Sequence, residues 1–390
     1  LNLKKGQTIE FSTKKRKGTV YINYQEFARD VKENDNVLLY DGKIVLKVQR
    51  SNNIDSVILK VEFGGILHSR KGVNLPNTSI SLPCLTKKDL LDLKFILNQD
   101  IEWVGLSFVR KSKDVLDLRK KLKLKKSTIK IIAKIEKPEA ISNIDDIIDV
   151  TDAIMVARGD LGVEVPPQKV PVYQKMIVNK CISKSRPVII ATQMLESMTL
   201  SPSATRAEVN DVANSVIDGA DALMLSGETS VGKHPLRVVD TMRKVIKDVE
   251  RSKHSISKNT SERELVINER FVSNAICANA CQISEKVNAK AIITATYSGY
   301  NTIKTSSYRP TAYIYAFTNN HTILNTLSLV WGVKAFYYDG GKTTDDTVLE
   351  TKNILKKKKY LKKGDKVINI ASMPAEERGM TNMMKLSKVI

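Results

Sequence analysis

The chain has 390 residues and a mass of 43.6 kDa, enough for two or three domains with their own apolar cores. Its formal net charge of +21 comes mostly from lysines that are spread along the sequence, as at Lys123 and in residues 356–359. A nucleic-acid site needs basic residues gathered with aromatic or base-reading partners. The composition therefore favours a solvated basic surface, compatible with anionic substrates, and we expect no nucleic-acid partner.

Cysteine and histidine usage argues against disulfides and zinc. The chain has four cysteines and four histidines, and none of them shows the paired spacing of a zinc site. Cys277 and Cys281 lie one helical turn apart among small apolar residues, which is typical of buried thiols in a reducing compartment. We therefore expect a cytoplasmic protein. No apolar run reaches membrane-spanning length and nothing in the sequence resembles a secretory signal, so we expect no membrane partner.

Residues 1–82 are predicted to form a β-rich domain. The apolar runs there are short and β-branched, and Asp41-Gly42 and Gly64-Gly65 separate them as turns. This pattern is typical of a small antiparallel barrel or sandwich. The predicted strands are residues 8–12, 19–23, 36–40, 43–48 and 57–63.

Residues 83–254 alternate strand-like runs with helical stretches, which predicts parallel βα units of a (β/α)8 TIM-type barrel. The predicted strands are residues 102–106, 129–135, 153–157, 188–191 and 222–225, with a long charged helix at 231–254. A closed barrel of this type needs eight strands, so we expect that the first three are absent from this chain. An open parallel sheet leaves apolar edges bare, and we do not expect the chain to fold normally alone.

Residues 255–390 are predicted to form a C-terminal α/β domain behind an exposed linker at 255–261. Its predicted strands are residues 291–295, 313–317, 334–338 and 366–371.

Acidic side chains follow two neighbouring barrel strands. Glu136 and Asp160 each stand just beyond a strand end, where TIM-type barrels keep their active sites. Two carboxylates of this kind suit a Mg²⁺ (or Mn²⁺) ion that completes its shell with water and substrate oxygens. The alternative is that both form structural ion pairs with nearby lysine or arginine side chains.

Three further features surround these carboxylates. Lys134 lies two residues before Glu136 and points to the same face, where its ammonium can neutralise a transferring phosphoryl group. The turn at Arg158, Gly159 and Asp160 exposes backbone N–H groups that can hold a carboxylate, although a plain tight turn is the alternative. Thr192 ends the next strand and can pass a proton through water or simply cap a helix.

Two phosphate sites are predicted outside the barrel. Lys71 lies in a basic, glycine-containing loop that can clamp a nucleotide phosphate, although an exposed basic loop is the commoner meaning. Thr294, Thr296, Ser298 and Thr302 crowd a turn before a helix, where hydroxyl and N–H groups make a phosphate pocket or ordinary caps.

Together these segments resemble the pyruvate kinase family. The resemblance rests on residues 134–136 (KIE), 155–162 (MVARGDLG), 191–198 (ATQMLESM), 205–208 (TRAE) and 225–229 (LSGET), and it extends to 71–76 (KGVNLP). These motifs occur in one order and spacing over nearly the whole chain.

The resemblance implies phosphoryl transfer from phosphoenolpyruvate to ADP, followed by protonation of the enolate to pyruvate. It implies that the divalent metal binds the two acidic residues, that Lys134 is catalytic, and that the backbone around Ala157, Arg158 and Gly159 holds the substrate carboxylate. Thr192, Ser226 and Glu228 would serve proton delivery, and Lys71 would reach the nucleotide from a mobile lid. A homotetramer and K⁺ dependence are implied by the family alone.

The effector region departs from the family pattern. The effector turn is Thr296, Tyr297, Ser298, Gly299 and Asn301, with asparagine where the family has a small or hydroxylated residue. The loop at 372–379 is acidic, which predicts weak or altered activation by fructose bisphosphate. A catalytically inactive truncated homologue that binds metabolites or partner subunits is the alternative hypothesis.

Overall fold

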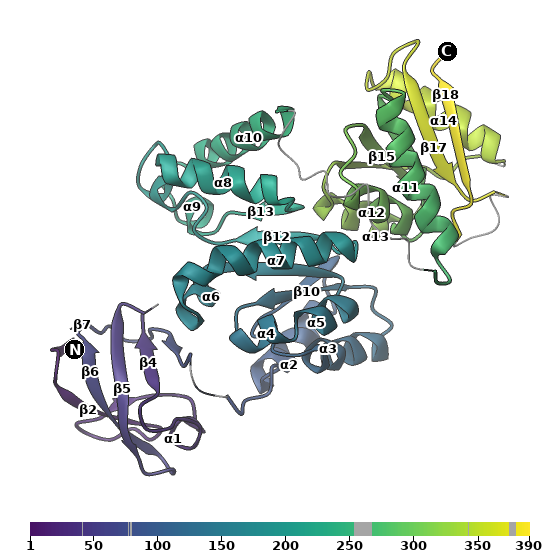
Figure 1. The fold of residues 1–390 in the computed structure, drawn as a ribbon. Helices are drawn as coiled ribbons and strands as arrows, with labels where there is room; N and C mark the ends of the chain where they lie inside the picture. Colours follow the sequence, from purple (N-terminus) through teal and green to yellow (C-terminus); the bar gives the residue numbers. More distant parts are fainter. Residues whose placement is uncertain (41, 77, 79, 253–266, 342, 374–379) are drawn as a thin grey trace.

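The structure is a computed structural model that describes residues 1–40, 42–76, 78, 80–252, 267–341, 343–373 and 380–390 (Figure 1). The linker predicted at 255–261 and residues 374–379 of the predicted acidic loop lie outside these residues. The described chain forms one six-stranded sheet, two five-stranded sheets and a two-stranded ribbon. Each of the larger sheets belongs to one of three successive parts of the chain.

The first part is the predicted β-rich unit. Its sheet has the order β3-β2-β6-β5-β4-β8 and is antiparallel except for the parallel β2–β3 pair. Side chains alternate between buried and half-buried along β4 and most of β5, because one sheet face packs on a core that includes Phe11 and Phe27. The elements are β1 (Asn2–Leu3), β2 (Thr8–Ser12), β3 (Val20–Tyr21), α1 (Phe27–Asp30), β4 (Asn36–Leu39), β5 (Ile44–Ser51), β6 (Ser56–Phe63), β7 (Gly65–Ile66) and β8 (Val73–Asn74).

The second part is a five-stranded sheet with the order β13-β12-β11-β10-β9, and every pair in it is parallel. All four residues of β12 are buried, as expected of a strand covered on both faces. The strands are β9 (Trp103–Leu106), β10 (Lys130–Ile135), β11 (Ala153–Ala157), β12 (Val188–Ala191) and β13 (Ala222–Met224). Parallel pairing brings all their carboxyl ends to one edge, as the sequence predicted.

Helices pack around this sheet (Figure 1). They are α2 (Lys87–Ile96), α3 (Ser112–Leu124), α4 (Pro138–Ser142), α5 (Ile144–Val150), α6 (Arg158–Glu164), α7 (Val170–Ser183), α8 (Arg206–Asp218), α9 (Gly227–Ser230) and α10 (Pro235–Arg251), with short 3-10 turns at Pro167–Lys169 and Glu196–Thr199. The helix predicted at 231–254 is therefore shorter, because Pro235 occupies its first turn. Thr205 and Glu208 form the capping box that begins α8, which gives the 205–208 motif a structural role.

The third part is a mixed sheet with the order β16-β15-β14-β17-β18. Its elements are α11 (Phe271–Lys286), β14 (Ala291–Ala295), α12 (Tyr300–Ser307), β15 (Tyr313–Thr318), α13 (His321–Thr326), a 3-10 turn at Leu327–Leu329, β16 (Val333–Tyr337), α14 (Thr344–Lys357), β17 (Lys366–Ala371) and β18 (Met383–Lys388). The antiparallel edge strand β18 was not predicted.

Buried polar contacts join the third part to the barrel sheet. The Arg309 guanidinium pairs with Asp221 at 3.0 Å and donates to the carbonyl oxygen of Gly219 at 2.8 Å. The Trp331 N–H donates to the same Asp221 carboxylate at 3.1 Å. The side chains of the ion pair are only 3% and 5% exposed, so this contact fixes the third part against the β12–β13 side of the sheet. Among the described residues, no helix has the length and apolarity needed to cross a membrane.

Candidate active site

Lys134 and Glu136 meet at the carboxyl end of β10. The two side chains point to the same side of the strand, as predicted, and Lys134 Nζ lies 2.5 Å from Glu136 Oε1. The other carboxylate oxygen, Oε2, accepts the backbone N–H of Phe108 at 2.8 Å. Because Glu136 is only 1% exposed, these two contacts stabilise a charge that burial alone would disfavour.

Two residues of this site, Ser107 and Phe108, were missed by the sequence reasoning. They follow β9, so the strand-end rule used for the other strands would have found Ser107, whose hydroxyl is a polar side chain at a strand end. Ser107 Oγ accepts a hydrogen bond from Lys134 Nζ at 3.0 Å. Phe108 has a φ of 55°, an unusual conformation for a bulky residue, and this turns its N–H toward the Glu136 carboxylate. Together they hold the lysine and the glutamate in one arrangement.

Asp160 lies on the adjacent chain segment. Strand β11 pairs in register with β10, with Val156 opposite Ile135, and α6 begins directly after β11 at Arg158. Asp160 is in the first turn of α6 and is exposed, and within the described residues its carboxylate has no hydrogen bond or ion pair. The oxygen atoms of Asp160 and Glu136 are the donors that a hard divalent cation prefers.

The predicted metal site would have few protein ligands. Across the described part of the chain, no group of three or more His, Cys, Asp or Glu side chains gathers as a metal site. Since Mg²⁺ commonly uses only one or two protein carboxylates and keeps several waters, a pair of carboxylates is consistent with that ion.

The Arg158 side chain turns into the protein. Its guanidinium pairs with Asp211 at 2.6 Å and donates to the carbonyl oxygen of Thr192 at 2.8 Å. These contacts brace the start of α6 against α8 and against the end of β12. In the predicted substrate-binding turn, the Arg158 side chain thus supports the local fold, whereas the Asp160 side chain is exposed.

Thr192 lies against the backbone of the same turn. Its hydroxyl accepts the Gly159 N–H at 2.7 Å and donates to the carbonyl oxygen of Ala191 at 2.6 Å. A Cβ atom at Gly159 would come within 3.2 Å of the Thr192 hydroxyl oxygen, so a side chain there would push the two segments apart. Thr192 also has a φ of 71°, which is sparsely populated for a β-branched residue and is often found at functional sites.

Ser226 and Glu228 follow β13. Glu228 is 1% exposed, and its two carboxylate oxygens accept backbone N–H groups from Ser226 at 2.7 Å and from Leu195 at 3.3 Å. The carboxylate therefore ties the loop after β13 to the loop after β12.

Lys71 lies in the β-rich unit and is exposed, with Nζ 4.2 Å from the centre of the Tyr40 ring. Three residues further on, Asn74 Nδ2 donates to Glu164 Oε1 at 3.0 Å, at the end of α6. The same oxygen is 2.6 Å from Lys137 Nζ in a buried ion pair. This contact links the loop that carries Lys71 to the helix that carries Asp160.

The predicted effector turn follows β14. Gly299 has a φ of 81°, and its N–H donates to Thr296 Oγ1 at 3.0 Å, while Ser298 is exposed. Asn301 is buried, and its amide donates to the carbonyl oxygen of Ala295 at 3.0 Å and to Thr381 Oγ1 at 3.1 Å. Asn301 therefore braces the turn from inside.

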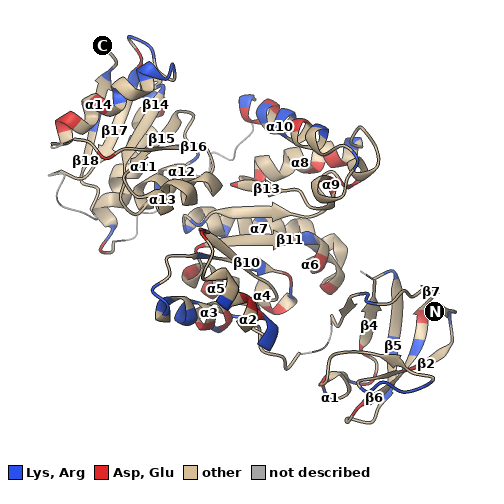
Figure 2. Ribbon diagram, turned by 180° about the vertical axis from the view of Figure 1, so that it is seen from behind, with Lys and Arg blue, Asp and Glu red and all other residues tan. Residues whose placement is uncertain are grey.

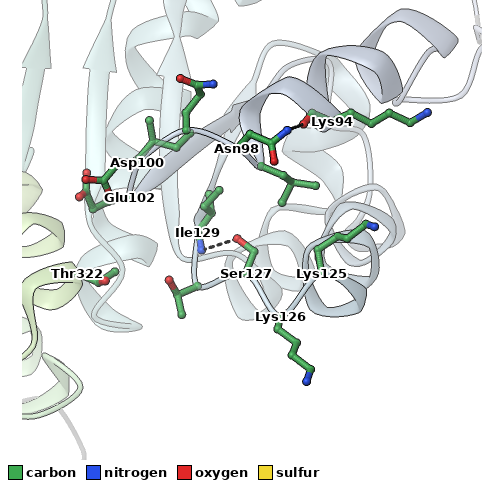
Figure 3. Close-up of a pocket in the computed structure, with 13 residues that line it drawn as sticks. Lys94, Asn98, Asp100, Glu102, Lys125, Lys126, Ser127, Ile129 and Thr322 are labelled. Atoms are coloured by element: carbon green, nitrogen blue, oxygen red, sulfur yellow. Dashed lines mark hydrogen bonds between the residues drawn. The ribbon is translucent and has the colours of Figure 1, made fainter.

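A groove lies at the opposite edge of the barrel sheet (Figure 3). It is lined by residues that precede β9 and β10, including Asp100, Glu102 and Ser127, and by Thr322 from α13. Because the groove is at the amino ends of the strands, it is separated from the residues gathered at their carboxyl ends. That edge of a barrel sheet usually serves stability.

A parallel barrel-type sheet with a lysine and carboxylates at its carboxyl ends defines an enzyme of the α/β-barrel class. Comparisons with known proteins specify the family. Residues 1–239 match the family described as pyruvate kinase, barrel domain, and residues 274–387 match pyruvate kinase, alpha/beta domain.

Individual relatives agree. A pyruvate kinase of Staphylococcus saprophyticus is 40% identical over 394 residues, which cover 100% of this chain and 67% of that protein. A pyruvate kinase of Clostridium acetobutylicum is 41% identical over 94% of this chain and 77% of its own length. A crystal structure of a pyruvate kinase from Cryptosporidium parvum superposes with a TM-score of 0.90 at 32% identity, covering 100% of this chain and 80% of that one.

The chain belongs to the pyruvate kinase family. Its function is accordingly that of an enzyme that transfers a phosphoryl group between phosphoenolpyruvate and a nucleoside diphosphate. The predicted α/β fold and the predicted family are both confirmed by these comparisons.

Proposed function

We propose that Glu136 and Asp160 hold one Mg²⁺ (or Mn²⁺) ion and that Lys134 is the main catalytic residue in phosphoryl transfer from phosphoenolpyruvate to ADP. The observation that carries the proposal is the Lys134–Glu136 pair, 2.5 Å apart at the carboxyl end of β10, beside the open Asp160 carboxylate. When bound, the cation would supply positive charge to the oxygens of the substrate. The remaining steps depend on the protein's own side chains.

Lys134 would stabilise the negative charge that spreads over the transferring phosphoryl group and the enolate oxygen. Catalysis of this reaction is mostly positioning and electrostatics, so a pre-oriented ammonium is more effective than a free one. The hydrogen bond to Ser107 and the ion pair with Glu136 supply that orientation.

The substrate carboxylate would bind at the start of α6, along the backbone of Ala157, Arg158 and Gly159. The side-chain contacts of Arg158 support a positioning role for this residue, because its guanidinium is engaged with Asp211 and the Thr192 carbonyl group. Thr192 would lie on the proton-delivery side, where its hydroxyl can relay a proton through water. Ser226 and Glu228 would support this relay by fixing the neighbouring loops.

Lys71 would reach the nucleotide phosphates when the β-rich unit closes over the site, which would exclude water and limit hydrolysis of the phosphoryl group. We further propose, from the family alone, a homotetramer, a requirement for K⁺ and a cytoplasmic location. The effector turn at Thr296, Ser298, Gly299 and Asn301 is proposed as a phosphate site.

A coupled assay for pyruvate formation from phosphoenolpyruvate and ADP tests the proposal, with Mg²⁺, Mn²⁺ and K⁺ added or omitted. We expect turnover that requires the divalent cation and that falls steeply in Glu136→Gln. Cation-independent turnover would contradict the metal assignment.

Replacing Lys134 by methionine tests the catalytic lysine. We expect kcat to fall by at least about 10³-fold, because several kcal/mol of transition-state stabilisation would be lost. Lys130→Met is the matched control, because Lys130 begins the same strand at the opposite edge of the sheet. Near-normal turnover of the Lys134 variant would defeat the assignment.

A further inference from the structure

A hollow of about 580 Å³ lies in the third part of the chain, at the amino ends of β14, β15 and β16. The turn between α14 and β17 completes the hollow. All of its lining residues belong to the third part of the chain: Lys290, residues 313–315, residues 332–334, residues 359–362 and Asp365. The predicted effector turn follows the carboxyl end of β14. The hollow and that turn are therefore at opposite edges of one sheet.

The floor of the hollow is aromatic. Tyr313 and Tyr315 are two residues apart on β15 and lie on the same face, with ring centroids 6.3 Å apart and ring planes inclined by 28°. Tyr360 packs on Tyr315 at 5.4 Å. Tyr315 is 5% exposed while Tyr313 is 57% exposed, so a fixed aromatic cluster ends in an accessible ring. Such a ring can stack on a flat ligand.

Lysine side chains surround this floor. Lys290 Nζ lies 5.2 Å from the centre of the Tyr313 ring, and Lys334 Nζ lies 4.4 Å from that of Tyr360. Lys359 and Lys362 also line the hollow. Across the described residues none of these four lysines forms an ion pair with a carboxylate, whereas Lys385 of the same sheet pairs with Asp345 at 2.6 Å.

The one carboxylate that lines the hollow among the described residues, that of Asp365, offsets only part of the charge of the four lysines. Asp365 Oδ2 accepts the backbone N–H of Lys362 at 2.8 Å, which ties it to the turn. The hollow thus combines an exposed aromatic ring with an excess of positive charge. A small inorganic anion would use only the lysines, and an apolar molecule would use only the rings.

We propose that this hollow binds a nucleoside phosphate. Its base stacks on Tyr313, and its phosphate contacts Lys290 and Lys334. Phosphate binding replaces the ring-face contact of Lys290, and the hydrogen bond that Lys334 donates to the Tyr360 hydroxyl, with charge-assisted hydrogen bonds. The volume is within the range of pockets that hold small organic ligands. This site is separate from the catalytic residues and from the predicted effector turn.

Calorimetric titration of the protein with AMP tests the aromatic half of the site. Tyr313→Ala should weaken AMP binding by about tenfold, as expected when one stacking partner is lost. Tyr337→Ala is the matched control, because Tyr337 is also exposed but ends the neighbouring strand at the opposite edge. It should leave the affinity unchanged. Equal affinities in the native protein and Tyr313→Ala would overturn the proposal.

The charged half is tested with the double variant Lys290→Gln, Lys334→Gln and with two partial ligands. AMP should bind at least about tenfold more weakly to the double variant, and inorganic phosphate alone or adenosine alone should bind the native protein more weakly than AMP. Phosphate binding as tight as that of AMP would identify a plain basic surface and overturn the proposal. Tyr313 is the one substituted residue that belongs to the aromatic floor of the hollow. Circular dichroism checks that each variant is folded.

Discussion

At the scale of single residues, the site depends on how Lys134 is held. Its ammonium contacts the Glu136 carboxylate and the Ser107 hydroxyl, and Phe108 fixes the carboxylate from the other side. The Ser107 hydroxyl is neutral, so removing it leaves the Lys134–Glu136 ion pair intact. Ser107 is therefore the position at which orientation can be tested separately from charge.

Ser107→Ala should lower kcat by about 10-fold to 100-fold, the loss expected for one hydrogen bond to a charged group. Ser107→Thr, which keeps the hydroxyl, should recover most of the activity. Ser112→Ala serves as the control, because Ser112 begins α3 and within the described residues makes no side-chain hydrogen bond. Steady-state kinetics that are the same for Ser107→Ala and the control would show that orientation of Lys134 does not depend on this hydroxyl.

The sequence identified Lys134 and Glu136 because a spacing of two residues on a strand fixes a common side. It did not identify Phe108. Phe108 contributes a backbone N–H group that is turned toward Glu136 by a positive φ angle. A phenylalanine in the sequence gives no sign of a positive φ angle. Backbone donors of this kind become visible only when the neighbouring strand is in place.

At the scale of secondary-structure elements, the contact between β8 and α6 joins the β-rich unit to the catalytic edge. Asn74 donates to Glu164 at 3.0 Å, and Glu164 ends the helix whose first turn carries Asp160. Glu164 Oε2 is buried without a partner within the described chain, so both donors, Asn74 and Lys137, use the same oxygen. The position of the loop that carries Lys71 is therefore mechanically connected to that of the helix.

Asn74→Ala should raise the KM for ADP by roughly 3-fold to 10-fold, because the loop that carries Lys71 loses a hydrogen bond to a charged partner. The KM for phosphoenolpyruvate should change less. Asn36→Ala, in the strand β4 of the same sheet, is the control for removing an asparagine side chain there. An equal rise in both Michaelis constants would argue against a specific connection to the nucleotide.

Elements with a clear hydrophobic period were predicted closely. The strands at 153–157, 188–191, 291–295 and 366–371 have the predicted bounds, because each is an apolar run between turn signals and is mostly buried. Strand β18 was missed since Met383–Lys388 is half polar and exposed, with two lysines. Its place is set by pairing with β17 at the edge of the sheet, which no local pattern encodes.

At the scale of the whole molecule, charge is distributed unevenly between surface and interior. Lysine and arginine residues recur along α3, and in α14 acidic residues in the first turn give way to lysines in the last turn, as the colours of the ribbon in Figure 2 show. Several weakly acidic groups are instead buried or half-buried. Burial raises the pKa of Cys84 and Tyr315 to about 12 and that of Cys277 to about 11, from ordinary values of 9.0 for a thiol and 10.0 for a phenol.

These shifts predict that the protein loses stability at alkaline pH. A group whose pKa is higher in the folded protein binds its proton more tightly there. Its contribution to the free energy of unfolding is therefore fully present below the pKa of the unfolded chain, and it is lost as the pH rises through the pKa of the folded protein. The free energy of unfolding, measured by urea titration, should therefore fall between about pH 9, where a thiol of the unfolded chain titrates, and about pH 12, where the folded groups do. Lys352 acts in the opposite direction, because its pKa is lowered. Burial is the larger cause, and the positive charge of Lys385 is the smaller one. Tyr315→Phe should show a shallower fall, and an equal fall in both proteins would contradict the role given to this tyrosine.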